Sequence, residues 1–131
     1  MRKDIKIPEV KGVFMAAIGS FNEAHRTQDW HAYLINDTTE AMETVLIVSS
    51  GSTTNQRTST MRHKLELLPA KAYAKVEFLE DSVLKLNNVF KVTFFMNGKL
   101  FDKTFTFSAN SIKEVKAKKL PVIPEKGILA E

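Results

Sequence analysis

Histidine and cysteine are common metal ligands in proteins, and this sequence offers few of them. It contains no cysteine and three histidines, His25, His31 and His63. No two of these histidines have the spacing of four that aligns ligands on a helix, or the spacing of two that aligns them on a strand. The sequence therefore predicts no metal site and no cofactor, and the absence of thiols excludes cysteine nucleophiles and disulfide bonds.

Two serine-containing segments are candidates for a nucleophile or an anion site. Ser20 follows a glycine, and residues 49–52 surround Gly51, but neither has the Gly-x-Ser-x-Gly pattern of a nucleophile elbow. The backbone amides around Gly51 are a candidate anion site that the guanidinium groups of Arg57 and Arg62 would complete. The alternative is a mobile hairpin loop without a ligand.

General acid and base catalysis has a few candidate carboxylates. Glu77, Glu80 and Asp81 lie close together in the sequence, but the surrounding pattern does not mark them as buried, so we interpret them as solvated. An enzyme would need His31, His63 and one carboxylate to meet in one pocket with perturbed pKa values. The sequence favours a non-catalytic protein.

Positive charge is concentrated in two short runs of a chain whose formal net charge is +4. Contacts from such runs to phosphates would indicate a nucleic-acid or ribonucleoprotein accessory protein. Neither run has the interleaved aromatic side chains on which bases stack, so solvated strand or helix surfaces are the alternative. The candidate binding residues are Gly51, Arg57, Arg62, His63 and Lys64, and the second run contributes Lys113, Lys116, Lys118 and Lys119.

The elements that must position these residues follow a β pattern. Short segments rich in Val, Ile, Phe, Tyr and Thr alternate with turn residues, which is typical of antiparallel sheets. At 131 residues, the chain corresponds to one domain, 1–131. We predict an all-β, two-layer antiparallel β-sandwich of eight or nine short strands with at most one short helix. The expected strands are residues 10–18, 30–35, 45–49, 61–67, 71–79 and a hairpin over 89–107.

Individual segments allow finer predictions. Asn97-Gly98 is the preferred pair for a two-residue type I′ turn, which would place Phe94 opposite Phe101 and Val92 opposite Lys103. Lys103 then falls on the apolar face, where it should extend to a sheet margin or meet a carboxylate. Regular alternation in the strand 71–79 would place Ala72, Ala74, Val76 and Phe78 on one face and Lys71, Tyr73, Lys75 and Glu77 on the other.

The remaining segments are less regular. Residues 45–49 are apolar on both pleat faces, as in a strand covered on both sides. Residues 80–88 form a loop, a single helical turn or a crossover between sheets. Residues 112–119 form a basic edge strand or a short helix, and the prolines at 121 and 124 confine the following tail to a sheet edge or a surface groove.

Several of these segments carry a family resemblance. Residues 30–38, 46–51, 59–63, 90–95 and 99–103 together resemble a family of short uncharacterised bacterial proteins, some of which carry the automatic label phenylalanyl-tRNA synthetase alpha subunit. The synthetase Arg-x-Glu motif would fall on Arg62-His63-Lys64, where lysine replaces glutamate, so we transfer no synthetase residue. The strand pattern is also similar to immunoglobulin-like sandwiches that serve as binding modules.

The sequence thus leads to a hypothesis about function. The N-terminal residues 1–8 lack the apolar stretch of a secretory signal, and no apolar run approaches the ~20 residues that cross a bilayer, which indicates a cytoplasmic protein without a membrane partner. We expect an interaction or accessory module that binds a protein partner through the polar loop 50–60. A homodimer is the other expected assembly, because Phe95 and Leu100 would pair on the outer face of the hairpin.

Overall fold

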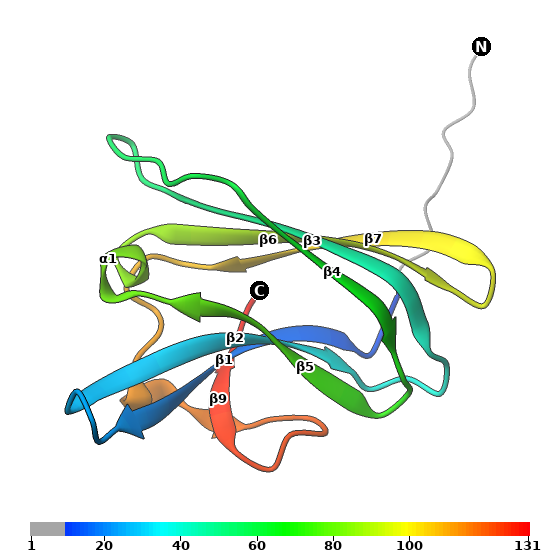
Figure 1. The fold of residues 1–131 in the computed structure, drawn as a ribbon, viewed down its shortest axis with the longest axis horizontal. Helices are drawn as coiled ribbons and strands as arrows, with labels where there is room; N and C mark the ends of the chain where they lie inside the picture. The colour runs from blue at the N-terminus through cyan, green and yellow to red at the C-terminus, as the bar shows by residue number, and fades with distance from the viewer. Residues whose placement is uncertain (1–9) are drawn as a thin grey trace.

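A computed structural model describes residues 10–131, which form two antiparallel β-sheets that face each other (Figure 1). The first sheet has the strand order β5-β2-β1-β9-β8 and the second has the order β4-β3-β6-β7. The prediction of an all-β sandwich is therefore confirmed. The strands are β1 (Val13–Asn22), β2 (Thr27–Asn36), β3 (Met42–Ser52), β4 (Met61–Leu68), β5 (Ala72–Leu79), β6 (Asn87–Met96), β7 (Lys99–Phe107), β8 (Lys118–Lys119) and β9 (Lys126–Leu129), with a helical turn α1 (Asp81–Leu84) and a 3₁₀ turn η1 (Glu114–Lys116).

The β6–β7 hairpin matches its prediction. Asn97 and Gly98 both have positive φ, 53° and 77°, as a type I′ turn requires. Phe94 lies opposite Phe101, and their rings stack with centroids 5.7 Å apart. The inner faces of both sheets then close over one apolar core, whose largest fully buried side chains are Phe90, Phe94 and Phe107.

Within residues 10–131 Lys103 meets no carboxylate, and its side chain extends instead to the start of β1. Its ammonium donates to the backbone carbonyls of Val13, at 3.0 Å, and Val10, at 3.3 Å. It also lies over the rings of Phe14 and Phe105, 5.9 and 5.3 Å from their centroids. Carbonyl oxygens and aromatic faces thus stabilise a charge that the alternation of β7 places toward the core.

A β-bulge in β5 overturns the predicted faces of its second half. The register with β2 shifts between Ala32 and Tyr33, so Val76 has no counterpart on β2. Beyond this extra residue Glu77 pairs with buried Ala32 and points inward, whereas Phe78 pairs with His31 and is 48% exposed. Sequence alternation could not reveal the bulge, because one inserted residue exchanges the two faces of everything after it.

The strand ends also differ from the sequence prediction. β1 continues through Gly19, which pairs with Trp30. Glycine suits this position because a Cβ would lie 3.1 Å from the Trp30 ring. β3 is longer than predicted and buries only its inner face, since Leu46 on the outer face is 45% exposed. Residues 80–88 contain the α1 turn and cross from the first sheet to the second, as two of the alternatives proposed.

The C-terminal tail covers the outer face of the first sheet. Leu120 and Ile123 pack on Ala16, Ile18 and Ile35, so this face is buried by the same chain. The tail then returns as β9, a strand that the sequence did not indicate, and pairs with β1. The expected basic edge strand or helix at 112–119 is reduced to η1 and the two-residue β8.

The outer face of the second sheet has no such cover within residues 10–131. Phe95 and Leu100 pair as predicted and are 41% and 55% exposed. Leu67 on β4 lies in the same row across the sheet, separated from Phe95 by Glu43. Self-association through this face stays a prediction.

Residues 1–8, on which the argument about a secretory signal rests, lie outside the described residues.

Candidate functional site

The β3–β4 connection is a hydrogen-bonded hairpin rather than a mobile loop. Ser52 and Arg57 form an isolated β-bridge, and the amide of Thr53 donates to the carbonyl of Gln56 at 2.8 Å. The Thr53 hydroxyl accepts from the amides of Asn55 and Gln56 at 3.3 and 3.2 Å. Figure 1 shows this hairpin extending beyond the sandwich on the side of α1.

The predicted anion site at Gly51 does not form. The Gly51 amide donates to the Thr58 hydroxyl at 2.8 Å, and the Thr53 amide is bonded within the turn. An anion site needs free backbone N–H groups directed to one point. Gly51 is instead required by close packing, because a Cβ there would lie 2.9 Å from the Asn88 side-chain oxygen.

The other residues predicted for this site diverge. Arg62 and Lys64 lie on the outer face of β4, opposite Val48 and Leu46, and Lys64 pairs with exposed Glu66 at 3.2 Å. His63, between them, points to the inner side. The strand period of two directs His63 away from Arg62 and Lys64, so these three residues do not form one site.

His63 belongs instead to a polar cluster between the two sheets. Its Nε2 lies 2.8 Å from Glu77 Oε1, and the hydroxyl of Ser49 donates to the same oxygen at 2.5 Å. Because a carboxylate only accepts, Nε2 carries the proton of the first bond. The Glu77 side chain is 11% exposed. The interpretation of Glu77 as a solvated residue is therefore wrong, and the cause is the bulge that turns it inward.

This cluster forms the floor of a cavity of about 520 Å³, which we call the β4–β5 cavity. It opens where β4 and β5, the edge strands of the two sheets, separate. Its volume falls within the ~300–1,000 Å³ range of ligand sites. The lining residues are Ser49, Ser50, Gly51, Thr58, Ser59, Met61, His63, Glu77, Phe78, Glu80, Ser82, Val83 and Asn88.

The cluster lacks the arrangement of a serine nucleophile. Such a site needs an imidazole that accepts the serine proton and amides that bind the oxyanion. Here Ser49 donates to Glu77, and the nearby amide of Gly51 is occupied by Thr58. The cluster is suited to holding a fixed carboxylate at the cavity floor. Within the described chain, no three His, Asp or Glu side chains are grouped to hold a metal ion.

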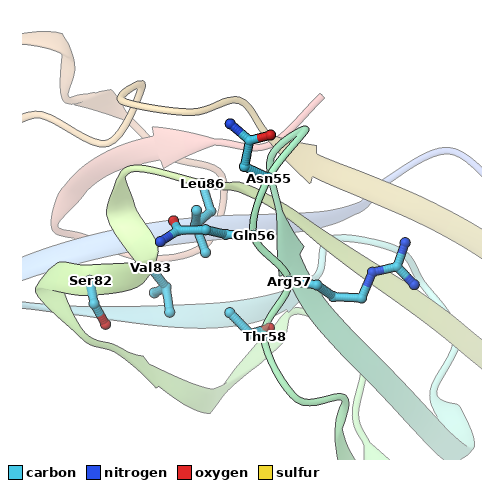
Figure 2. A pocket seen from close by; sticks show the side chains of 7 residues that line it. All are labelled: Asn55, Gln56, Arg57, Thr58, Ser82, Val83 and Leu86. Atoms are coloured by element: carbon cyan, nitrogen blue, oxygen red, sulfur yellow. The ribbon is translucent and has the colours of Figure 1, made fainter.

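A second cavity flanks the other side of the hairpin. It has a volume of about 450 Å³ and shares Thr58, Ser82 and Val83 with the β4–β5 cavity. Figure 2 shows the Gln56 side chain directed toward Val83 and Leu86, whereas Arg57 points away from them. We call the hairpin 53–60 together with the α1 segment 80–86 the loop end.

The second basic run lies away from the loop end. Lys116, Lys118 and Lys119 line a cavity of about 330 Å³ at β8, and Lys126 pairs with Lys119 across β8 and β9. Lys113 precedes η1. β8 is the edge of the first sheet opposite β5, whereas Arg62 and Lys64 lie on β4, which borders β5. The two basic runs therefore do not form one continuous surface.

His31 does not join His63, because it faces the outer side of the first sheet. Its ring lies against Phe78, with centroids 5.2 Å apart. Burial lowers the pKa of His31 below its usual 6.5, and the positive charge of Lys75 lowers it further, while Asp29 opposes both. The enzyme hypothesis from the sequence required His31 and His63 in one pocket. The fold does not bring these two histidines together.

This pKa shift predicts a pH dependence of stability. A histidine whose pKa is lower in the folded state binds more protons when unfolded, so it reduces the free energy of unfolding as pH falls below about 6.5. We expect His31→Gln to lose stability less steeply than wild type between about pH 7.5 and 5, and Lys75→Gln to show an intermediate dependence. Urea unfolding at both pH values measures this, and equal slopes in all three proteins would contradict it.

Sequence reasoning did not select Ser49, Glu77 and Asn88 as site residues, although it considered the segment 49–52 and set Glu77 aside as solvated. Ser49 and Asn88 are buried polar residues, 4% and 6% exposed, on strands whose inner faces are otherwise apolar. A polar residue at an inward position of an apolar strand was the signal that could have found them. For Glu77 no such signal existed, because the bulge reverses its expected face.

Comparisons with known proteins identify no family for this chain. No known protein family matches the chain, and no curated protein matches it either. Among the helices of residues 10–131, none is long and apolar enough to cross a membrane.

Proposed function

We propose that this protein is a non-catalytic, cytoplasmic interaction module with an immunoglobulin-like sandwich, and that it binds a protein partner through the loop end. The strand orders β5-β2-β1 and β4-β3-β6-β7 support the immunoglobulin-like part. They correspond to strands E-B-A facing C′-C-F-G of that fold, without a strand D. Sandwiches of this type commonly bind through the loops at one end.

One observation carries the proposal: two cavities flank the same ordered hairpin and share Thr58, Ser82 and Val83. A hairpin held by its own hydrogen bonds loses little conformational entropy on binding, which favours recognition. Polar groups around concave, partly apolar surfaces are typical of binding sites.

A shortened hairpin tests the proposal. Replacing residues 53–56 by Asn-Gly would join the bridged pair Ser52 and Arg57 through a two-residue turn. It would remove Asn55 and Gln56 from the lining of the second cavity and leave the lining residues of the β4–β5 cavity unchanged. Partners captured by wild type from nuclease-treated lysate should be lost by this variant. They should be retained by Lys99→Ala, at the tip of the β6–β7 hairpin, which lies at the opposite end of the sheet. Equal capture by both variants would refute a role for the loop end.

A nucleic-acid accessory role is the second candidate. Lys116, Lys118 and Lys119 line one cavity, and Lys126 pairs with Lys119 beside it, which supports this role. Such binding should vanish on nuclease treatment and weaken about a thousandfold between 50 and 200 mM salt if six or more phosphates are contacted. Substituting Lys118 and Lys119 by glutamate should then abolish capture, while the shortened hairpin should leave it unchanged.

A further inference from the structure

The β4–β5 cavity is rich in hydrogen-bond acceptors that remain open. Glu77 receives both the Ser49 and the His63 hydrogen bond on Oε1, and Oε2 has no partner within residues 10–131. No fully buried side-chain nitrogen or oxygen in this part of the chain lacks a hydrogen bond. Oε2 is therefore accessible to solvent, and the residue that carries it lines the cavity.

Asn88 presents a second acceptor. Its side-chain amide donates to the carbonyls of Val83, at 2.8 Å, and Leu86, at 3.0 Å, so both N–H groups are used and the amide orientation is fixed. The remaining Oδ1 lies beside Gly51, where a Cβ would approach it to 2.9 Å. Asn88 lines the cavity, and Oδ1, which has no donor within residues 10–131, is accessible to solvent by the same argument as Glu77 Oε2.

Some donors in the cavity are occupied, and the hydroxyls of Ser50, Ser59 and Ser82, which also line it, can either donate or accept. The His63 N–H is bonded to Glu77, the Gly51 amide to Thr58, and the Thr58 hydroxyl to the Ser59 carbonyl at 3.1 Å. Glu80 adds a second carboxylate to the lining. A cation that donates several hydrogen bonds complements the two carboxylates and the open acceptors of this cavity.

The cavity margin also includes apolar surface. Phe78 and Met61 line it and are 48% and 47% exposed. A guanidinium group donates five hydrogen bonds in a planar fork and stacks on aromatic rings, whereas an ammonium is a compact, strongly hydrated charge. The guanidinium group therefore matches the cavity better than the ammonium group. The cavity combines open acceptors from two strands, a negative floor and an aromatic margin.

We propose that the β4–β5 cavity binds the side chain of an arginine presented by the partner protein, with Glu77 and Asn88 as its acceptors. This inference rests on the proposed function, since it names what the partner inserts at the loop end. The arginine would serve as the anchor of the complex, as arginine often does where it is desolvated at an interface.

The test uses N-acetyl-arginine N-methylamide as the probe in a two-dimensional NMR titration of the whole protein. We expect saturable shifts of the amide signals of Ser49, Glu77 and Asn88. The corresponding citrulline compound, which has nearly the same shape but no charge, should bind at least about tenfold more weakly. The blocked lysine compound should also bind more weakly. Equal affinity for the citrulline or the lysine compound would overturn the inference.

Variants then assign the effect to the cavity. Glu77→Gln keeps an acceptor for Ser49 and His63 but removes the charge, and it should weaken arginine binding about tenfold or more. Glu66→Gln, on the exposed face of β4 with a side chain 82% exposed, is the matched control and should bind as wild type. If Glu77→Gln does not fold, Ser59→Trp offers a second block, because exposed Ser59 lines this cavity and not its neighbour. Unchanged binding by the folded blocking variant would overturn the inference.

The two proposals can fail separately. If the shortened hairpin abolishes partner capture while Glu77→Gln and the arginine probe have no effect, the arginine inference is wrong and the binding role of the loop end stands. If the arginine compound binds saturably but Glu77→Gln captures the same proteins as wild type, the cavity recognises the cation outside the proposed protein contact, which also contradicts the inference.

Discussion

Replacing Phe90 with alanine is expected to lower the free energy of unfolding by about 3–5 kcal/mol. Phe90 is fully buried between the sheets, and its ring packs edge-on against Phe107 with centroids 5.9 Å apart. The substitution removes the buried ring, its contact with Phe107 and the volume that neighbouring side chains cannot refill.

Phe95 provides a matched control on the same strand. It has the opposite orientation, is 41% exposed and pairs with Leu100 on the outer face. Its replacement by alanine should cost less than about 1 kcal/mol, the value of one cross-strand pair. Urea unfolding at one pH measures both variants, and comparable losses would show that the two faces of β6 are not buried as described.

Replacing Asn36 with alanine is expected to cost about 2–4 kcal/mol, because carbonyl groups that are buried or partly buried lose their donor. The fully buried Asn36 side chain donates to the backbone carbonyls of Glu40, Leu68 and Pro69 at 2.9, 3.0 and 3.1 Å. Its oxygen accepts from the amide and the hydroxyl of Thr38. One side chain thus joins the end of β2 to the turn between β4 and β5.

Three comparisons sharpen this prediction. Asn36→Asp should be at least as damaging as the alanine variant, since a carboxylate would face three carbonyl oxygens without a proton to donate. Asn55→Ala, in the exposed β3–β4 hairpin, should remain near wild type. Because Asn36 bonds to Leu68 and Pro69, the NMR signals of these two residues' neighbours should shift in Asn36→Ala. A stable Asn36→Asp protein would contradict this account.

The sequence predicted those parts of the fold that depend on local chemistry. Asn97-Gly98 has a strong preference for one turn, so it defined the register of β6 and β7 correctly, down to the pair of Phe94 and Phe101. The alternation of β5 was correct up to Lys75 and wrong beyond it, because a bulge depends on pairing with β2 and leaves no mark in the periodicity. β9 was missed for a related reason, since a four-residue strand is recognisable only from the β1 edge that it joins.

The candidate site was less predictable than the fold. Gly51 and His63 line the same cavity, yet the contacts that bring them together are not those on which their selection rested. Ser49 and Glu77 are 28 positions apart and come from different sheets, so their contact depends on how the sandwich closes. The separation of His63 from Arg62 and Lys64 follows from strand geometry, which directs adjacent residues to opposite faces.

The extra residue at Val76 has a consequence for how this chain can change over evolution. When a regular strand gains or loses one residue, every later side chain moves to the opposite face of the sheet. A bulge absorbs such a change at a single position, so the later side chains keep their faces. Losing Val76 would leave a regular β5 in which Glu77 still pairs with Ala32 and Phe78 with His31. Homologous chains of this fold are therefore expected to differ in length at this position while keeping the acidic cavity floor.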